Sequence, residues 1–583
     1  MRAYKNILIF SFLITVLFSS CKVQKTPGES LPYIPWNPGG NEETKNTEFY
    51  ESLMDGLKEE LINYNFEAAL HYYENCLRLR PDDPTVLYKL GQIYFKAGRI
   101  SESVASLKKA FEIDPSNYWI GHALADIYQQ NNDFENAELV FEKMVKIFPD
   151  NISLKKDLAF AYYNSGKLMK SVKVLDDIEK IVGITEEITE QKKVIYLNLK
   201  KFDKAVEELQ KLINANPENT DYIRKLIDLY VAYNKDDKVF DLYQRIIEIN
   251  PNDPTAQLIV ADYYLRWNRR DEGLKLAEKA LGNPYLDLQS KVTFLMLNFL
   301  NKGIKEENRD IILKFSDLLV ATHPSDSRVY SFRGDVKTAL KMENEALDDY
   351  IRALQDEKNI AVLWNTVIVG LIKRGNYTDA LAYSQEALEH FPLNPELYLY
   401  AGMCHLRLKE FAKAAEILES GLIYVKNNDL LAYQFYANLG EAFNGTKDYE
   451  KSDNYFDKAL KIDNQDLSLL NNYAYYLSLR REKLDKAAEM SLKTLEKEPQ
   501  NPAYLDTYGW ILFLQNDLNN AKIYIEKALE KKSWDAEILE HYGDVLYKLG
   551  DTENALKYWL RAKEKGSLSE QLDKKIAGKK YYE

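Results

Sequence analysis

Apolar and polar residues follow one another along most of the chain with the period of amphipathic helices. In the block Tyr118–Asn151 the large and small apolar residues recur three or four positions apart within two stretches: Leu124, Ala125, Tyr128, Ala137 and Phe141. This spacing places apolar side chains on one face of a helix. Pro149 then ends the second stretch, because proline cannot continue a helix. The block therefore predicts two helices that pack through their apolar faces.

The same pattern returns about every 34 residues over nearly all of residues 50–569. A period of this length indicates an array of stacked helical repeats. Fifteen repeats can be laid end to end, and they begin near Tyr50, Pro84, Tyr118, Ile152, Glu186, Thr220, Pro254, Leu288, Ser327, Ala361, Pro395, Tyr433, Leu467, Pro502 and Ala536.

Fixed places within the repeat carry residues with a mechanical role. Numbering each repeat from its first residue, place 8 is small in most repeats, as at Gly91 and Gly402, and place 20 is small on the second helix, as at Ala137. Small residues there allow two helices to approach closely. Glycine occupies place 15 in four repeats, including Gly98, where the first helix requires a left-handed cap.

This arrangement resembles the tetratricopeptide repeat. The resemblance implies an all-α fold, a right-handed superhelical solenoid of antiparallel helix pairs. In that family the first helices line a concave groove, with places 2, 5, 9 and 12 pointing inward. On this resemblance the groove-binding residues include Tyr88, Gln92, Trp119, His122, Asp126, Arg224, Asp228, Asp262, Asp335, Glu441, Asp506, Trp510 and Asp544.

Many side chains at these inward places are acidic or aromatic. Place 9 is acidic in six repeats, and Tyr88, Trp119 and Trp510 lie among the carboxylates. Such a surface suits a basic extended peptide, or a carbohydrate stacked on aromatic rings. The alternative is that the polar residues only keep the inner face soluble.

Departures from the period predict the domain organisation. Residues 288–326 are about five residues longer than one repeat, and their second helix lacks the small residues. This segment is either a kink or merely a longer loop. It would separate an N-terminal lobe of about seven repeats, residues 50–287, from a C-terminal lobe of about seven repeats, residues 327–569. Residues 570–583 would form a capping helix, which the end of a solenoid requires.

The N-terminus has the features of an export signal. Residues 1–20 begin with two basic side chains and continue with an apolar run of 12 residues, which is typical of a signal peptide. The segment Leu17–Cys21 resembles a bacterial lipobox, in which the cysteine becomes the acylated first residue; the alternative is a plain signal peptide with an incidental cysteine. Residues 21–49 would be a flexible tether. Lys22 after the cysteine favours the outer membrane by analogy with lipoprotein sorting.

Charge and motifs argue against nucleic acid and against catalysis. The formal net charge is −13, whereas nucleic-acid binding requires a basic face. The six histidines are never three or four residues apart, and the sequence has no phosphate-binding loop or nucleophile elbow. Cys76 and Cys404 occupy places where small buried side chains are normal. We therefore expect no enzyme activity, no metal and no cofactor.

Together these features predict a membrane-anchored scaffold of the bacterial cell envelope that mediates protein–protein interactions in secretion, surface assembly or cell-wall machinery. Its partners would be other envelope proteins or peptides. The alternative is a periplasmic solenoid that binds polysaccharide for an export system. The resemblance to a repeat family supports the scaffold by analogy alone.

Overall fold

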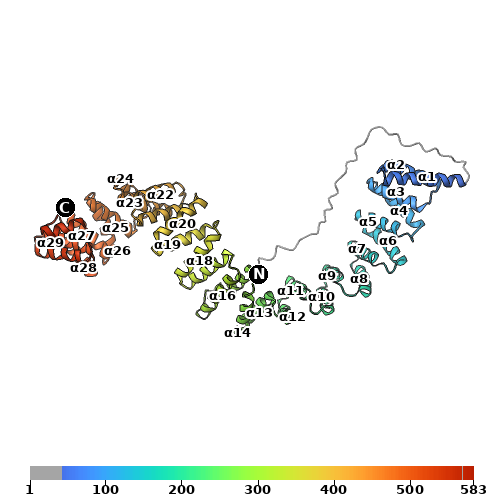
Figure 1. Cartoon of the computed structure of the whole chain (residues 1–583), viewed down its shortest axis with the longest axis horizontal. Helices are drawn as coiled ribbons and strands as arrows, with labels where there is room; N and C mark the ends of the chain where they lie inside the picture. The colour runs from blue at the N-terminus through green and yellow to red at the C-terminus, as the bar shows by residue number, and fades with distance from the viewer. Residues whose placement is uncertain (1–41, 302, 568, 583) are drawn as a thin grey trace. The chain divides into compact units, whose positions relative to one another are not determined.

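The structure is a computed structural model that describes residues 42–301, 303–567 and 569–582. The predicted signal peptide, Cys21 and most of the predicted tether lie outside the described residues. Within the described residues every regular element is a helix, and the helices follow one another as antiparallel pairs (Figure 1). The predicted all-α repeat array is confirmed.

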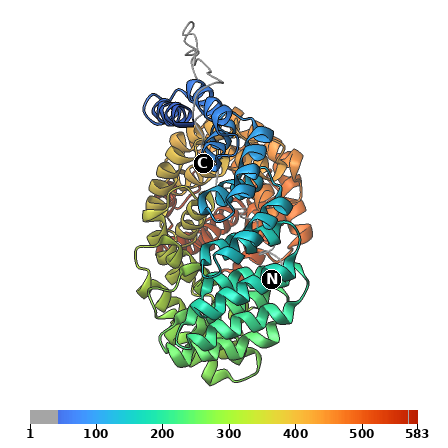
Figure 2. The same cartoon turned by 90° about the vertical axis from the view of Figure 1, so that its right-hand side faces the viewer.

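The chain divides into two compact units, one up to Pro251 and one from Asn252 onward. In the first unit each pair stacks on the next (Figure 2). Its helices are α1 (Glu42–Leu61), α2 (Phe66–Leu79), α3 (Pro84–Lys96), α4 (Ile100–Ile113), α5 (Tyr118–Gln130), α6 (Phe134–Ile147), α7 (Ile152–Asn164), α8 (Leu168–Val182), α9 (Glu186–Asn198), α10 (Phe202–Ala215), α11 (Thr220–Ala232), the 3₁₀ turn η1 (Asp236–Lys238) and α12 (Val239–Ile249).

The second unit continues the same alternation of first and second helices. Its first part holds α13 (Pro254–Arg266), α14 (Arg270–Leu281), α15 (Leu288–Leu295), the π-helical turn η2 (Met296–Leu300), the 3₁₀ turn η3 (Glu306–Asn308), α16 (Arg309–Thr322), α17 (Ser327–Ala339), α18 (Glu343–Asp356), α19 (Ala361–Lys373) and α20 (Tyr377–His390). Its second part holds α21 (Pro395–Arg407), α22 (Phe411–Leu422), α23 (Asp429–Gly445), α24 (Tyr449–Ile462), α25 (Leu467–Arg480), α26 (Leu484–Lys497), α27 (Pro502–Leu514), α28 (Leu518–Lys531), α29 (Ala536–Lys548), α30 (Thr552–Glu564) and α31 (Glu570–Gly578).

Thirteen of the fifteen predicted repeat starts coincide with the first residue of a helix. The exceptions are Tyr50 and Tyr433, because α1 begins at Glu42 and α23 begins at Asp429. The left-handed backbone predicted at place 15 is present at all four glycines, as at Gly98 with φ of 74°. Other repeats adopt it with asparagine or lysine, as at Asn132 and Lys200. The turn between paired helices is therefore set by the geometry of the repeat and not by glycine alone.

Small residues at place 8 allow the paired helices to approach as predicted. A methyl group built on Gly402 of α21 would lie 2.4 Å from Leu418 Cγ of α22, far inside van der Waals contact. In some repeats a serine at place 20 adds a hydrogen bond to the same junction: the Ser103 hydroxyl donates to the Gly91 carbonyl oxygen at 2.6 Å. Each pair is thus joined by close backbone approach and, in these repeats, by a buried hydrogen bond.

The division between the units falls earlier than the predicted end of the N-terminal lobe at residue 287. The repeat just before this division carries Ile227, Val239 and Ile246 at places 8, 20 and 27, which are small in most other repeats. These three branched side chains are buried and leave less room for a close approach of α11 and α12 than glycine or alanine would. The bulk at these three places accompanies the division of the chain, and the predicted boundary at 288–326 stays a prediction.

The predicted tether is too long at its C-terminal end, because α1 begins at Glu42 and not after residue 49. Two acidic residues in the first turn of α1 favour a helix N-terminus. The Arg80 guanidinium lies 4.1 Å from the centre of the Phe49 ring and donates to Asn46 Oδ1, which holds this extension against α2. At the other end of the chain, α31 occupies the position of the predicted capping helix.

The segment 288–326 is irregular, as the sequence predicts. Its first helix, α15, passes into the π-helical turn η2 after eight residues. Lys291 of α15 is fully buried, and its ammonium donates to Thr322 Oγ1 at 2.9 Å. Burial lowers the pKa of Lys291 to about 8. The two interpretations of this segment, a kink or merely a longer loop, both stay predictions.

Candidate binding groove

First helices of neighbouring repeats pack directly on one another, as α3 does on α5 in the first unit and α25 on α27 in the second. This places the first helices on the inner side of each array, where the path from repeat to repeat is shorter. A groove on this inner side would be lined by residues at places 5, 9 and 12 of the first helices.

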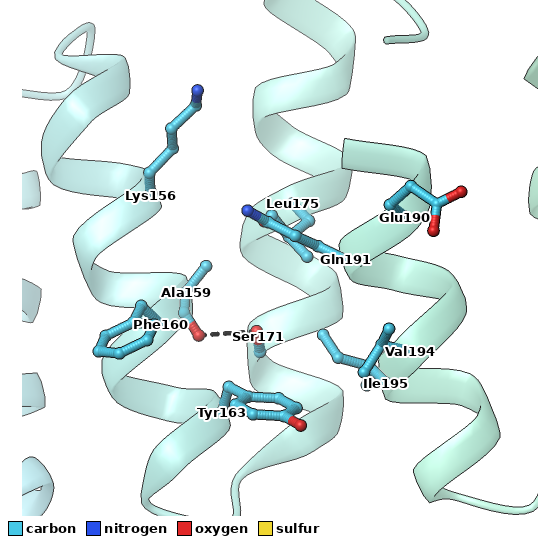
Figure 3. Close-up of a pocket in the computed structure, with 10 residues that line it drawn as sticks. All are labelled: Lys156, Ala159, Phe160, Tyr163, Ser171, Leu175, Glu190, Gln191, Val194 and Ile195. Atoms are coloured by element: carbon cyan, nitrogen blue, oxygen red, sulfur yellow. Dashed lines mark hydrogen bonds between the residues drawn. The ribbon is translucent and has the colours of Figure 1, made fainter. Parts of the chain in front are cut away.

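The first unit has a cavity at these places, of about 340 Å³, between α7, α8 and α9 (Figure 3). Lys156, Phe160 and Tyr163 line it from places 5, 9 and 12 of α7. From α9, Val194 and Ile195 face the two rings, and Gln191 reaches across the opening while Glu190 points away. Ser171 and Leu175 of α8 form the floor, where the Ser171 hydroxyl donates to the Ala159 carbonyl oxygen at 2.7 Å.

The walls of this cavity are apolar and open to solvent. Phe160 is 54% exposed and Val194 is 42% exposed, so both retain apolar surface that no described residue covers. Polar contacts between α7 and α9 fix the two ends of the cavity. Lys156 Nζ lies 2.7 Å from Glu187 Oε2, and Asn198 Nδ2 donates to Tyr163 Oη at 2.9 Å. The result is an open apolar cavity held between two polar bridges.

One repeat earlier, the inner face carries carboxylates around a histidine. His122 Nδ1 lies 3.0 Å from Asp126 Oδ2, and His122 Nε2 lies 3.9 Å from Asp157 Oδ2 on α7. The hydrogen bond to Asp126 raises the pKa of His122 above its usual value. Burial raises the pKa of Asp157. The ring of Trp119 is exposed beside this group, at the start of the same helix.

A second cavity, of about 390 Å³, lies at the equivalent junction of the second unit, between α17, α18 and α19. Asn365 and Val369 line it from places 5 and 9 of α19, opposite Tyr350 of α18. Asn365 Nδ2 donates to Glu396 Oε2 at 2.6 Å, while its Oδ1 is buried and has no hydrogen-bond partner among the described residues. The repeat geometry therefore generates a cavity at the same junction in each unit.

Several predicted groove residues of the first unit lie on the inner helices and contact each other. Gln92 Nε2 donates to Tyr88 Oη at 2.7 Å, which fixes both side chains on α3. His122 and Asp126 form the pair described above. Arg224 is half-buried and Asp228 is exposed, both on α11.

In the second unit the predicted carboxylates are tied to neighbouring side chains. Asp262 accepts from Arg266 and from Asn298 Nδ2, the latter at 3.1 Å. Asp335 Oδ1 accepts from Tyr350 Oη at 2.9 Å. Glu441 lies 3.9 Å from Arg407. These carboxylates therefore already have partners within the chain.

Asp506 and Asp544 do not line an open groove, and their placement there was wrong. Asp506 is buried against His541, and Asp544 accepts from Trp559 Nε1 at 2.9 Å and from Lys575 Nζ at 2.6 Å. Trp510 of the same group stacks on the His541 ring, with centroids 4.1 Å apart. The reason is that α31 brings Lys575 over the inner face of the last repeats.

Phe160, Tyr163 and Val194 were missed as candidate site residues. A signal for them exists in the sequence, because place 9 is polar in about half of the repeats but apolar in six, at Phe160, Val194, Met296, Val369, Met403 and Trp510. An apolar residue at an inward and solvent-facing place is the pattern that marks this cavity.

The described residues offer no sign of metal or thiol chemistry. Among them no group of three or more histidine, cysteine, aspartate or glutamate side chains is placed to hold a metal ion. Burial raises the pKa of Cys76 to about 12 and that of Cys404 to about 11, so both thiols stay protonated within the core. No helix in the described part of the chain is long and apolar enough to cross a membrane.

Comparisons with known proteins agree with the repeat. Sequence models described as tetratricopeptide repeat match residues 60–107, 122–151, 194–219, 371–439, 433–466 and 503–530, and one described as TPR repeat matches residues 91–132. The ER membrane protein complex subunit 2-A of Xenopus laevis is 27% identical over 169 residues, which are 29% of this chain and 56% of that protein. The chain thus spans about half the length of this curated relative.

Solved structures resemble the chain more remotely. The APC/C hetero-tetramer Cut9–Hcn1 matches with 15% identity over 85% of this chain and 96% of the other, at a TM-score of 0.36. A tetratricopeptide repeat protein from Parabacteroides merdae matches with 15% identity over 43% of this chain and 98% of the other, also at 0.36. The helix pairs, the repeat places and the matching sequence models together show that the chain contains tetratricopeptide repeats.

Proposed function

We propose that this protein is a scaffold of the bacterial cell envelope, anchored through an acylated Cys21, whose inner groove binds extended segments of other proteins. The observation that carries the binding role is the open apolar cavity between α7 and α9. Its volume lies at the lower end of the range for ligand sites, roughly 300–1,000 Å³. It suits one large apolar side chain of a peptide better than a whole cofactor.

The carboxylates beside the cavity favour a basic residue in the same ligand. Asp126 and Asp157 share only His122 as a partner within 4 Å among the described residues, and Trp119 adds an aromatic face that attracts cations. Adjacent helices are about 10 Å apart, and an extended chain rises about 3.3 Å per residue. The basic residue would therefore lie roughly three positions from the apolar one.

Phe160→Asp and Val194→Asp are each expected to reduce partner capture at least tenfold, because a carboxylate in the cavity opposes an apolar side chain. The measurement is crosslinking and capture from native membranes, followed by identification of the bound proteins. Leu139→Asp is the matched control, since Leu139 is equally exposed on the second helix α6. Equal capture by Phe160→Asp and wild type would contradict the proposal that partners bind in this groove.

The alternative, a solenoid that binds polysaccharide, is favoured by one observation, the exposed Trp119 ring on the same helix as the Asp126 carboxylate. The same capture experiment separates the two. Polysaccharide that is retained by wild type and lost from Trp119→Ala, with no protein recovered, would replace the peptide groove by a glycan site.

Cys21→Ser is expected to release the protein from the membrane fraction into the soluble fraction. The reason is that the thiol is the only group that the predicted lipobox offers for acylation. Fractionation of cells after labelling with a fatty-acid analogue gives the measurement. A Cys21→Ser protein that stays in the membrane fraction, or a wild type that takes up no label, would contradict the anchor while leaving the groove intact.

A further inference from the structure

The first helix of the array exposes an apolar stripe. Tyr50, Met54 and Leu61 on α1 are 56%, 64% and 57% exposed, and they stand four and seven residues apart. This spacing keeps them on one side of the helix over about 16 Å. Ile62 and Tyr64, directly after α1, are also exposed and extend the stripe. Exposed apolar surface that is contiguous in this way marks an interaction site more often than isolated exposed residues do.

The helix that carries the stripe lacks one neighbour that the other first helices of the unit have among the described residues. Every other first helix of the unit, α3, α5, α7, α9 and α11, packs against the second helix of the repeat before it. No described helix precedes α1. The outer face of a terminal repeat is ordinarily polar, because nothing covers it. On α1 three large apolar side chains are exposed instead, so this end of the array offers apolar surface that no described residue covers.

The charge around the stripe indicates which kind of helix would complete the junction. Residues Glu42–Leu61 contain seven acidic and two basic side chains. Glu51 and Asp55 are exposed along α1 next to the stripe, and no cation lies within 4 Å of either among the described residues. This charge repels an anionic membrane surface, and it would repel a second copy of the same acidic helix. It attracts a helix whose polar face is basic.

We infer that the stripe formed by Tyr50, Met54 and Leu61 docks a basic amphipathic helix of a partner protein. The partner helix buries its apolar face on the stripe and places lysine or arginine beside Glu51 and Asp55. This is the helix-in-groove mode of recognition, here at the end of a solenoid. It is independent of the groove between α7 and α9.

The test is a binding titration of the full chain with a fluorescent 18-residue helical peptide that carries leucine on one face and lysine on the other. We expect saturable binding that Met54→Asp and Leu61→Asp each weaken at least tenfold. The double charge reversal Glu51→Lys/Asp55→Lys should make the protein bind the peptide that carries glutamate in place of lysine more tightly than the lysine peptide. Phe160→Asp, which alters the groove, should leave the titration unchanged.

Other results would overturn the inference. Binding that is unaffected by Met54→Asp and Leu61→Asp, or no binding at all, would show that the stripe does not take a basic helix. Crosslinks from α1 to residues 31–36 of the same chain would assign the stripe to that segment. A dimer in sedimentation that Met54→Asp abolishes would assign it to a second copy. Circular dichroism melts of each variant verify that the exposed substitutions leave the fold intact.

Discussion

Lys192→Met is expected to destabilise the first unit by about 3–5 kcal/mol, the cost of removing one partner from a buried ion pair. The Lys192 side chain on α9 is only 1% exposed. Its ammonium lies 2.7 Å from Asp176 and 2.5 Å from Glu179, both on α8, and 2.7 Å from Glu208 on α10. One cation therefore joins three consecutive helices.

The pKa of Lys192 shows the balance of the forces in this cluster. Burial lowers the pKa, but hydrogen bonds to the three carboxylates outweigh burial, and the net effect is to raise it. Methionine fills a similar volume and removes the charge. Glu208, which is buried, then keeps only Lys211 as a cationic partner, at 2.8 Å. This loss of one of two cationic partners by a buried carboxylate is the source of the expected destabilisation.

Hydrogen exchange of the amides in α8, α9 and α10 is the measurement, because a repeat array opens locally and a single unfolding midpoint is not well defined. Lys156→Met is the matched control, since its partner Glu187 is exposed, and an exposed pair contributes about 0–1 kcal/mol. Unchanged protection of α8–α10 would contradict the structural role of the cluster.

Lys192 also shows how much of this cluster can be predicted from the sequence. Place 7 holds leucine in the neighbouring repeats, at Leu158 and Leu226, so a lysine there is visible as a departure. The periodic pattern predicts that the position is buried, because a helix in this register must turn place 7 inward. It does not predict the three carboxylates, since these come from the geometry between helices and not from spacing along one of them.

The placement of the helices could be predicted because it depends on local signals. Apolar period, the left-handed turn and the terminating proline act within one repeat, as at Gly98 and Pro149. The groove was harder to predict, because exposure depends on what covers a residue from elsewhere in the chain. Asp544 occupies an inward place like Asp126, yet α31 brings Lys575 against it and closes the surface. Repeat register alone does not distinguish these two aspartates.

The pair of His541 and Asp506 is expected to make the last repeats less stable as the pH rises from about 6.5 to about 9. His541 Nδ1 lies 3.0 Å from Asp506 Oδ2, and the imidazole ring is buried. Burial lowers the pKa of His541, but the charge of Asp506 and the hydrogen bond to it prevail and raise the pKa to about 9. An unperturbed histidine has a pKa of about 6.5.

The direction in which stability changes with pH follows from proton binding. Between about pH 6.5 and 9 the folded state holds a proton on His541 that the unfolded state has lost, so stability falls as the pH rises. The contribution is fully present below pH 6.5 and is lost once the pH passes 9. A shift of this size corresponds to about 3 kcal/mol. Asp544, whose pKa burial raises to about 6, titrates below this window.

Asp506→Asn tests the pair, because it keeps the shape of the side chain and removes the charge that holds the proton. The free energy of local opening in α27–α29, from hydrogen exchange corrected for the intrinsic pH dependence, is measured for both proteins between pH 6 and 9.5. We expect wild type to exceed Asp506→Asn by about 3 kcal/mol at pH 6 and the difference to shrink toward pH 9.5. Asp485→Asn, which removes an exposed carboxylate that accepts from Gln515, is the control and should leave the slope unchanged. Parallel pH profiles for wild type and Asp506→Asn would show that His541 is neutral in the folded protein.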